Sequence, residues 1–148
     1  MVLASNTALY KQDYHLWLEA TIHQLRERDL ESLDWHNLIE ELEAMGRSDK
    51  RAILSNLRVL LRHLLKWKYQ PDKRSNSWNF TIIEHRTRIE DELTDSPSLK
   101  SYVLESIDRC YKKAKVLAAT ETSLPLNTFP SDCPFTAEEV LNPDYLPE

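Results

Sequence analysis

Four side chains near the middle of the chain are of the types that bind metal ions. Glu40, Glu41 and Glu43 stand close together, and His63 follows further along. Helical bundles bind pairs of metal ions through carboxylates and Glu-x-x-His pairs that face inward. A site of this kind therefore requires these carboxylates to point into a helical core.

The helical periodicity argues against that orientation. If Trp35, Leu38, Leu42 and Met45 face the core, Glu40 and Glu43 point toward solvent and only Glu41 lies at the border. We therefore predict no metal site and no cofactor, and expect Glu41 to contact His63 or Arg62 across a helical hairpin. The alternative is a metal-dependent nucleotide phosphohydrolase that uses Glu40, Glu43 and His63. The spacing of Glu40 and Glu43 resembles that of carboxylates in helical nucleotide pyrophosphatases, which bind metal ions that bridge the phosphates of the substrate.

Other catalytic arrangements are not found in the sequence. No Ser-His-Asp set and no nucleophilic cysteine site can be assembled, and a single glycine excludes a glycine-rich phosphate loop. The sequence therefore predicts no catalytic residue.

Basic and aromatic residues are interleaved between Arg58 and Trp78, after the glutamates at positions 40–43. Cations attract phosphates and aromatic rings stack on bases, so nucleic-acid binding is one function that this pattern indicates. The alternatives are that the preceding acidic helix neutralises the bases, or that their stems cover apolar surface. The candidate binding surface consists of Arg58, Arg62, Lys66, Trp67, Tyr69, Arg74 and Trp78.

The charge pattern supports this division into segments. Residues 10–46 hold nine acids and three bases, residues 47–74 hold nine bases and two acids, and residues 121–148 hold six acids and no base. One basic segment thus lies between acidic ones, although the net charge of the whole chain is only −5.

Apolar residues recur at spacings of three and four, which predicts amphipathic helices. Asp34 is expected to cap the second helix, and Gly46 to end it in the left-handed conformation. We predict five helices in residues 10–120. They span about 11–28, 35–45, 49–70, 78–93 and 97–120.

Residues 121–148 contain five prolines and little long periodicity. Thr136 and Glu139 form a capping-box pattern, and Phe135 with Val140 a hydrophobic staple, so a short helix is expected there. The sequence thus predicts an all-α fold. We expect residues 1–148 to form a single domain, in which residues 10–120 are a bundle of about five helices and residues 121–148 a proline-rich wrap that carries the short helix.

The composition bounds the cellular context. The two cysteines do not form a C-x-x-C motif, no leader peptide is recognisable, and no apolar run approaches the length of a membrane span. We expect a cytoplasmic protein that does not bind membranes.

Several short motifs occur in a fixed order along the chain. They are LIEELEAMG at 38–46, RHLLKWKYQP at 62–71, SW at 77–78, PSL at 97–99, FP at 129–130, CP at 133–134 and LP at 146–147. In these motifs the chain resembles the domain of unknown function 29 family, which is abundant in cyanobacteria, over residues 10–147. The resemblance implies an all-helical, compact, soluble bacterial protein and implies no reaction. Asn79 departs from the pattern, because family members often carry a basic residue there.

We interpret the sequence as a non-catalytic helical binding or interaction module. Its predicted partner is another protein or a second copy of itself, since amphipathic helices beside an aromatic and basic region are typical of interfaces. Nucleic-acid binding and a metal-dependent phosphohydrolase remain the alternatives.

Overall fold

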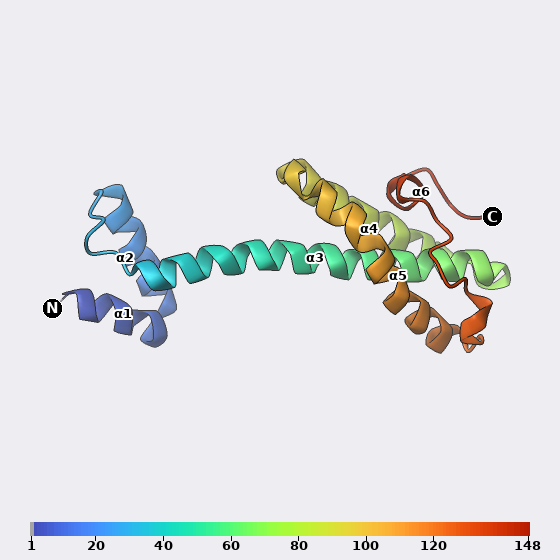
Figure 1. The fold of residues 1–148 in the computed structure, drawn as a ribbon, viewed down its shortest axis with the longest axis horizontal. Coiled ribbons are helices and arrows are strands. Elements are labelled where there is room, and N and C mark those ends of the chain that lie inside the picture. Colours follow the sequence, from blue (N-terminus) through green and yellow to red (C-terminus); the bar gives the residue numbers. More distant parts are fainter. Residues whose placement is uncertain (1) are drawn as a thin grey trace. The chain divides into compact units, whose positions relative to one another are not determined.

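A computed structural model describes residues 2–148, with side chains from Asn6 onward. It is all-α, as predicted, and this part of the chain contains no strand. Figure 1 shows its six α-helices. They are α1 (Val2–Gln12), α2 (Tyr14–Arg26), α3 (Trp35–Tyr69), α4 (Asn76–Asp95), α5 (Lys100–Thr122) and α6 (Ala137–Leu141), with short 3-10 turns at Pro71–Lys73, Pro97–Leu99 and Leu126–Thr128.

The chain divides into two compact units. Unit 1 is Met1–Ser48 and unit 2 is Asp49–Glu148, so the boundary falls within α3. The single domain that the length suggests stays a prediction. Each unit is described separately below.

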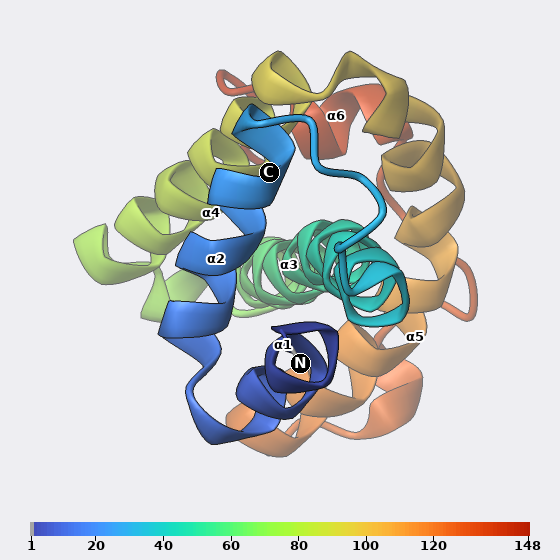
Figure 2. The ribbon, with the colours of Figure 1, turned by 90° about the vertical axis from the view of Figure 1, so that its left-hand side faces the viewer.

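Unit 2 is built around the C-terminal half of α3. Viewed along this helix in Figure 2, α4 and α5 flank it on opposite sides. Leucines and isoleucines at spacings of three and four make this half of α3 apolar on a broad face, which explains why it is the centre of the core. The fully buried core side chains contributed by α3 are Ile53, Leu57, Leu60, Leu61, Leu64 and Leu65.

The C-terminal segment packs on this core. Phe129, Phe135 and Val140 are buried, and the Thr136 hydroxyl accepts a hydrogen bond from the Glu139 amide at 3.1 Å. The Glu139 carboxylate in turn accepts one from the Thr136 amide at 2.9 Å, so the predicted capping box is confirmed. Local sequence alone specifies this short helix.

Unit 1 contains α1, α2 and the first turns of α3. Trp17 is buried, and its indole Nε1 donates to the Asp34 carboxylate at 3.1 Å. The Glu41 carboxylate accepts hydrogen bonds from the hydroxyls of Tyr10 and Tyr14, the latter at 2.8 Å. The expected contact of Glu41 with His63 or Arg62 is therefore wrong, because Glu41 and His63 lie on one continuous helix that makes no hairpin at Gly46.

Two predicted helix boundaries are also wrong. Gly46 has no positive φ, and α3 continues through it, since one glycine costs a helix only about 1 kcal/mol and its neighbours are good helix formers. The predicted first helix is instead interrupted at Asp13. The Asp13 carboxylate caps α2 by accepting from the Leu16 amide at 3.1 Å.

The predicted core faces of unit 1 are partly wrong as well. Trp35, Leu42 and Met45 are exposed and Leu38 is only half-buried, although their periodicity suggested a buried stripe. The spacing of Tyr14, Ile22 and Leu25 also predicts a buried face on α2, but all three side chains are exposed. Periodicity identifies an apolar face, but it does not show whether the same chain covers that face.

Candidate functional site

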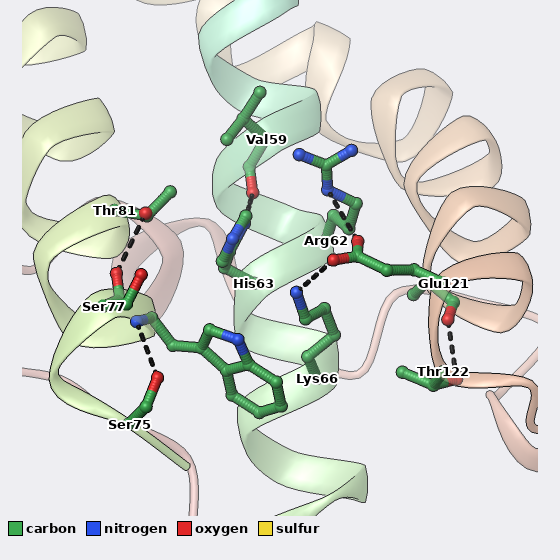
Figure 3. A network of polar contacts seen from close by, with 11 residues as sticks. Val59, Arg62, His63, Lys66, Ser75, Ser77, Thr81, Glu121 and Thr122 are labelled. Carbon is green, nitrogen blue, oxygen red and sulfur yellow. Dashed lines mark hydrogen bonds and ion pairs between the residues drawn. The ribbon is translucent and has the colours of Figure 1, made fainter. Parts of the chain in front are cut away.

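Lys66 lies at the centre of the region that the sequence singles out. Its side chain is only 4% exposed, and Figure 3 shows it between α4 and α5. The ammonium Nζ lies 2.6 Å from a Glu121 oxygen and 4.5 Å from the ring centroid of Trp78. An ion pair and a cation–π contact therefore hold this buried charge.

Glu121 joins two bases of α3. Its second oxygen lies 3.6 Å from Nε of Arg62. Burial alone would raise the pKa of the Glu121 carboxyl, but the hydrogen bond and charge of Lys66, together with Arg62, outweigh it and lower this pKa below its ordinary value. The acid that neutralises these bases thus comes from α5, whereas the sequence suggested the acidic helix before them.

Arg74 fastens the C-terminal end of the chain. Its Nε donates to the Trp67 carbonyl at 2.7 Å, and its Nη2 donates to the Glu148 carbonyl at 2.7 Å. Its guanidinium also lies 5.1 Å from the centroid of the Trp67 ring. Tyr69 packs edge-on against Phe129 at 5.2 Å between centroids.

Of the seven predicted binding residues, only Arg58 has no such contact among residues 6–148. The predicted binding surface stays a prediction, but most of its charged and aromatic side chains already contact other residues of the same chain.

A basic groove lies between α3 and α5 in unit 2. It consists of two adjoining hollows, one lined by Leu54, Cys110 and the stems of three bases, the other of about 400 Å³ with an apolar floor of Val116 and Leu117. None of its cations forms an ion pair within the described chain. We call this the α3–α5 groove and define it by Leu54, Arg58, Arg109, Lys112, Lys113, Val116 and Leu117.

The α5 half of this groove is not apparent from the overall charge pattern of the sequence. Bases and acids of residues 75–120 cancel in number, which concealed the local cluster of Arg109, Lys112 and Lys113. A helical wheel of α5 carries the missed signal, because Arg109, Lys113, Val116 and Leu117 recur at spacings of three and four.

The candidate metal ligands Glu40 and Glu43 do not lie near His63 in one site. Glu40 and Glu43 are exposed in unit 1, whereas His63 is buried in unit 2. Nδ1 of His63 donates to the Val59 carbonyl at 2.9 Å, one turn back in the same helix. Across the residues that the structure describes, no three His, Cys, Asp or Glu side chains are grouped so that they could hold a metal ion.

Two histidines of unit 2 should make the fold sensitive to acid. Burial lowers the pKa of His63, and the charges of Lys66 and Arg62 lower it further, against the opposing effects of the Val59 hydrogen bond and Glu121. Burial likewise lowers the pKa of His85, whose Nδ1 lies 2.8 Å from Oδ1 of Asn56.

The unfolded chain binds these two protons more tightly than the folded chain does. The stability that neutral His63 and His85 contribute should therefore be complete above pH 6.5, their ordinary pKa, and be lost as the pH falls through their lowered pKa values. We expect His63→Gln/His85→Gln to reduce the loss of stability between pH 7.5 and pH ~5, where unperturbed carboxyls remain ionised. Urea unfolding at both pH values measures it. Equal losses in the variant and the original chain would contradict this assignment.

An apolar face of α3 in unit 1 is left uncovered. Trp35, Ile39, Leu42 and Met45 are 50%, 51%, 59% and 64% exposed, and we call these four residues the α3 stripe. Gly46, the only glycine of the chain, continues the spacing of Trp35, Ile39 and Leu42 on one helix face. A Cβ built on Gly46 would meet no atom within 4 Å, so nothing near it within the described chain requires a glycine.

The sequence pattern of the family described as Domain of unknown function DUF29 matches residues 9–146, nearly the whole chain. No curated protein matches the sequence, and no solved structure matches it. Among the helices of residues 2–148, none is long and apolar enough to span a membrane.

Proposed function

The chain belongs to the DUF29 family, a domain of unknown function, and on this premise we propose that it is a helical module that binds another protein chain, a second copy included. The α3 stripe is the binding surface. The observation that carries the proposal is the exposure of four large apolar side chains in succession on one helix.

Exposed apolar surface is unfavourable in water, and monomeric proteins seldom leave a contiguous apolar patch of large area uncovered. Between Asn6 and Ser48, Trp17 and Leu33 are the large apolar side chains that are buried. Unit 1 therefore buries little apolar surface within itself, while its α3 stripe is available to a partner. Aromatic and methionine side chains such as Trp35 and Met45 are enriched at protein interfaces.

Gly46 is a second reason to assign the α3 stripe as the binding surface. Glycine inside a helix costs about 1 kcal/mol relative to alanine, and no contact among the residues that the structure describes explains it. A partner that approaches closely at this point does explain it, because a residue without a side chain lets two backbones come near.

The other two functions have less support. A metal-dependent phosphohydrolase would require Glu40, Glu43 and His63 to lie together, but they belong to no metal-binding group among the described residues. Nucleic-acid binding through the predicted basic surface would have to compete with the internal contacts of Lys66 and Arg74.

Leu42→Asp tests the proposal. Leu42 is exposed, so the free energy of unfolding should change by less than about 0.5 kcal/mol. Association should nevertheless weaken about tenfold or more, because a charge would enter an apolar interface. Light scattering over a concentration series measures self-association.

A photo-crosslinking residue at position 39 extends the test to other proteins. In host cells it should yield a discrete adduct with a protein chain. Position 83 is the matched control, since Ile83 is equally exposed, at 51%, but lies on α4. If position 39 gives no more adduct than position 83, and Leu42→Asp leaves association intact, the proposal is wrong.

A further inference from the structure

We propose that the α3 stripe of one copy binds the α3–α5 groove of a second copy of this chain. This inference rests on the proposed function, because it uses the same stripe, and it names the partner. Three features of the two surfaces support it: their apolar contact areas, their charges and the glycine.

The groove offers an apolar floor of the kind that the stripe needs. Val116 and Leu117 are 52% and 43% exposed, and they line a hollow of about 400 Å³. Helices with an apolar face commonly bind in hydrophobic grooves, with anchors at spacings of three and four residues. Trp35, Ile39 and Leu42 have this spacing.

The charges around the two surfaces are complementary. Residues 34–47 carry four acids, namely Asp34, Glu40, Glu41 and Glu43, and one base, Arg47. The groove carries four bases and no acid. Electrostatic complementarity of this kind selects the partner and its orientation.

These charges are also available. Glu40 and Glu43 are exposed and form no ion pair within residues 6–148. The bases of the groove also form no ion pair within residues 6–148. Arg109 contacts neutral groups there, namely the oxygens of Tyr102 and Ser106, each at 3.3 Å, and the ring of Tyr102, whose centroid is 5.9 Å away. Each surface therefore presents charge that the chain itself leaves uncompensated.

Gly46 fits a helix that enters a groove. Without a side chain at this position, the end of the stripe can approach the flanking α3 and α5 backbones of the second copy more closely than any other residue would allow. The contact joins two different surfaces, so it is heterologous, and each copy offers one of each.

Charge reversal on both surfaces tests the inference by light scattering and sedimentation. Lys112→Glu/Lys113→Glu should weaken self-association about tenfold or more, and so should Glu40→Lys/Glu43→Lys, because each puts like charges together. All four side chains are exposed, so these variants should fold. Lys73→Glu/Lys100→Glu makes the same change of net charge as Lys112→Glu/Lys113→Glu, at exposed positions outside both surfaces, and should associate like the original chain.

Two further measurements distinguish specific binding of the stripe to the groove from non-specific repulsion caused by the altered net charge. The chain with all four reversals should regain association, since the reversed charges that flank its stripe match the reversed charges of its groove. Mixing the two double variants should also restore it, because one contributes an unaltered groove and the other an unaltered stripe. Gly46→Ala should weaken association while raising stability.

The outcomes also separate the two proposals. If Lys112→Glu/Lys113→Glu associates like the original chain but Leu42→Asp does not, the groove is not the partner and the inference is wrong, while the proposed function stands. If an adduct at position 39 contains only a different protein, or nucleic acid, the inference is also wrong. A chain that stays monomeric at all concentrations tested overturns it too.

Discussion

Replacing Arg86 with alanine should destabilise the chain by about 3–4 kcal/mol and loosen its C-terminal segment. Arg86 on α4 is only 5% exposed. Its guanidinium donates to the carbonyls of Val140, Tyr145 and Glu139 at 2.9, 2.7 and 3.0 Å. Each hydrogen bond to a charged group contributes about 1.5–3 kcal/mol, and the carbonyls would lose their donor. The sum is less than three full contributions because the freed segment can become hydrated.

Arg88→Ala is the matched control for this prediction. Arg88 lies on the same helix, but its side chain is 56% exposed and forms its ion pair with Glu84, one turn away. Its removal should cost less than about 1 kcal/mol. Guanidinium unfolding gives both values, and limited proteolysis should cut residues 123–148 faster in Arg86→Ala alone. If both variants unfold at the same midpoint, Arg86 does not hold the segment.

Removing the carboxylate that faces Lys66 should produce the second large effect. Glu121→Gln removes the negative charge that faces the buried ammonium and leaves it a neutral amide oxygen and the Trp78 ring, and breaking a buried pair from one side costs about 3–5 kcal/mol. The side chain of Glu121 is 46% exposed, so water can reach the pair, and we expect about 2 kcal/mol. Lys66→Met/Glu121→Gln should recover most of this loss, because no buried charge then remains.

The same pair predicts a dependence on pH. The pKa of Glu121 is lowered in the folded chain, so its contribution to stability is complete above the ordinary value of 4.5 and is lost as the pH falls through the folded value. In Glu121→Gln this part of the acid denaturation should disappear. Glu105→Gln, at an exposed position on the same helix, should keep the original profile. A double variant as unstable as Glu121→Gln would contradict the role of the buried charge.

Local signals in the sequence were sufficient for much of the fold. Thr136 and Glu139 contact each other's backbone within one turn, so their capping box could be predicted without knowledge of the rest of the chain. The leucines of residues 53–65 form so broad an apolar face that only a core position suits them. Gly46 was misread because a glycine can end a helix or lie within one, and its own sequence context does not decide between the two.

The candidate surfaces depended on contacts that are distant in sequence. Arg62 and Lys66 were predicted to bind a partner, but Glu121 approaches them from α5. Arg86 carries no sequence signal at all, because its partners are backbone carbonyls, which every residue possesses. For the α3 stripe, periodicity indicates Trp35, Leu42 and Met45, but it selects Leu38 where the structure exposes Ile39, and it does not show that the face is exposed.

The sequence by itself thus determined the all-α class, most helices and the apolar face of each. These follow from backbone propensity, capping and periodicity, which act over a few residues. Tertiary structure alone decided which apolar faces are covered and which charges are compensated. Both depend on residues that are far apart in the chain and meet only after folding, as Lys66 meets Glu121, while Leu42 meets no covering partner.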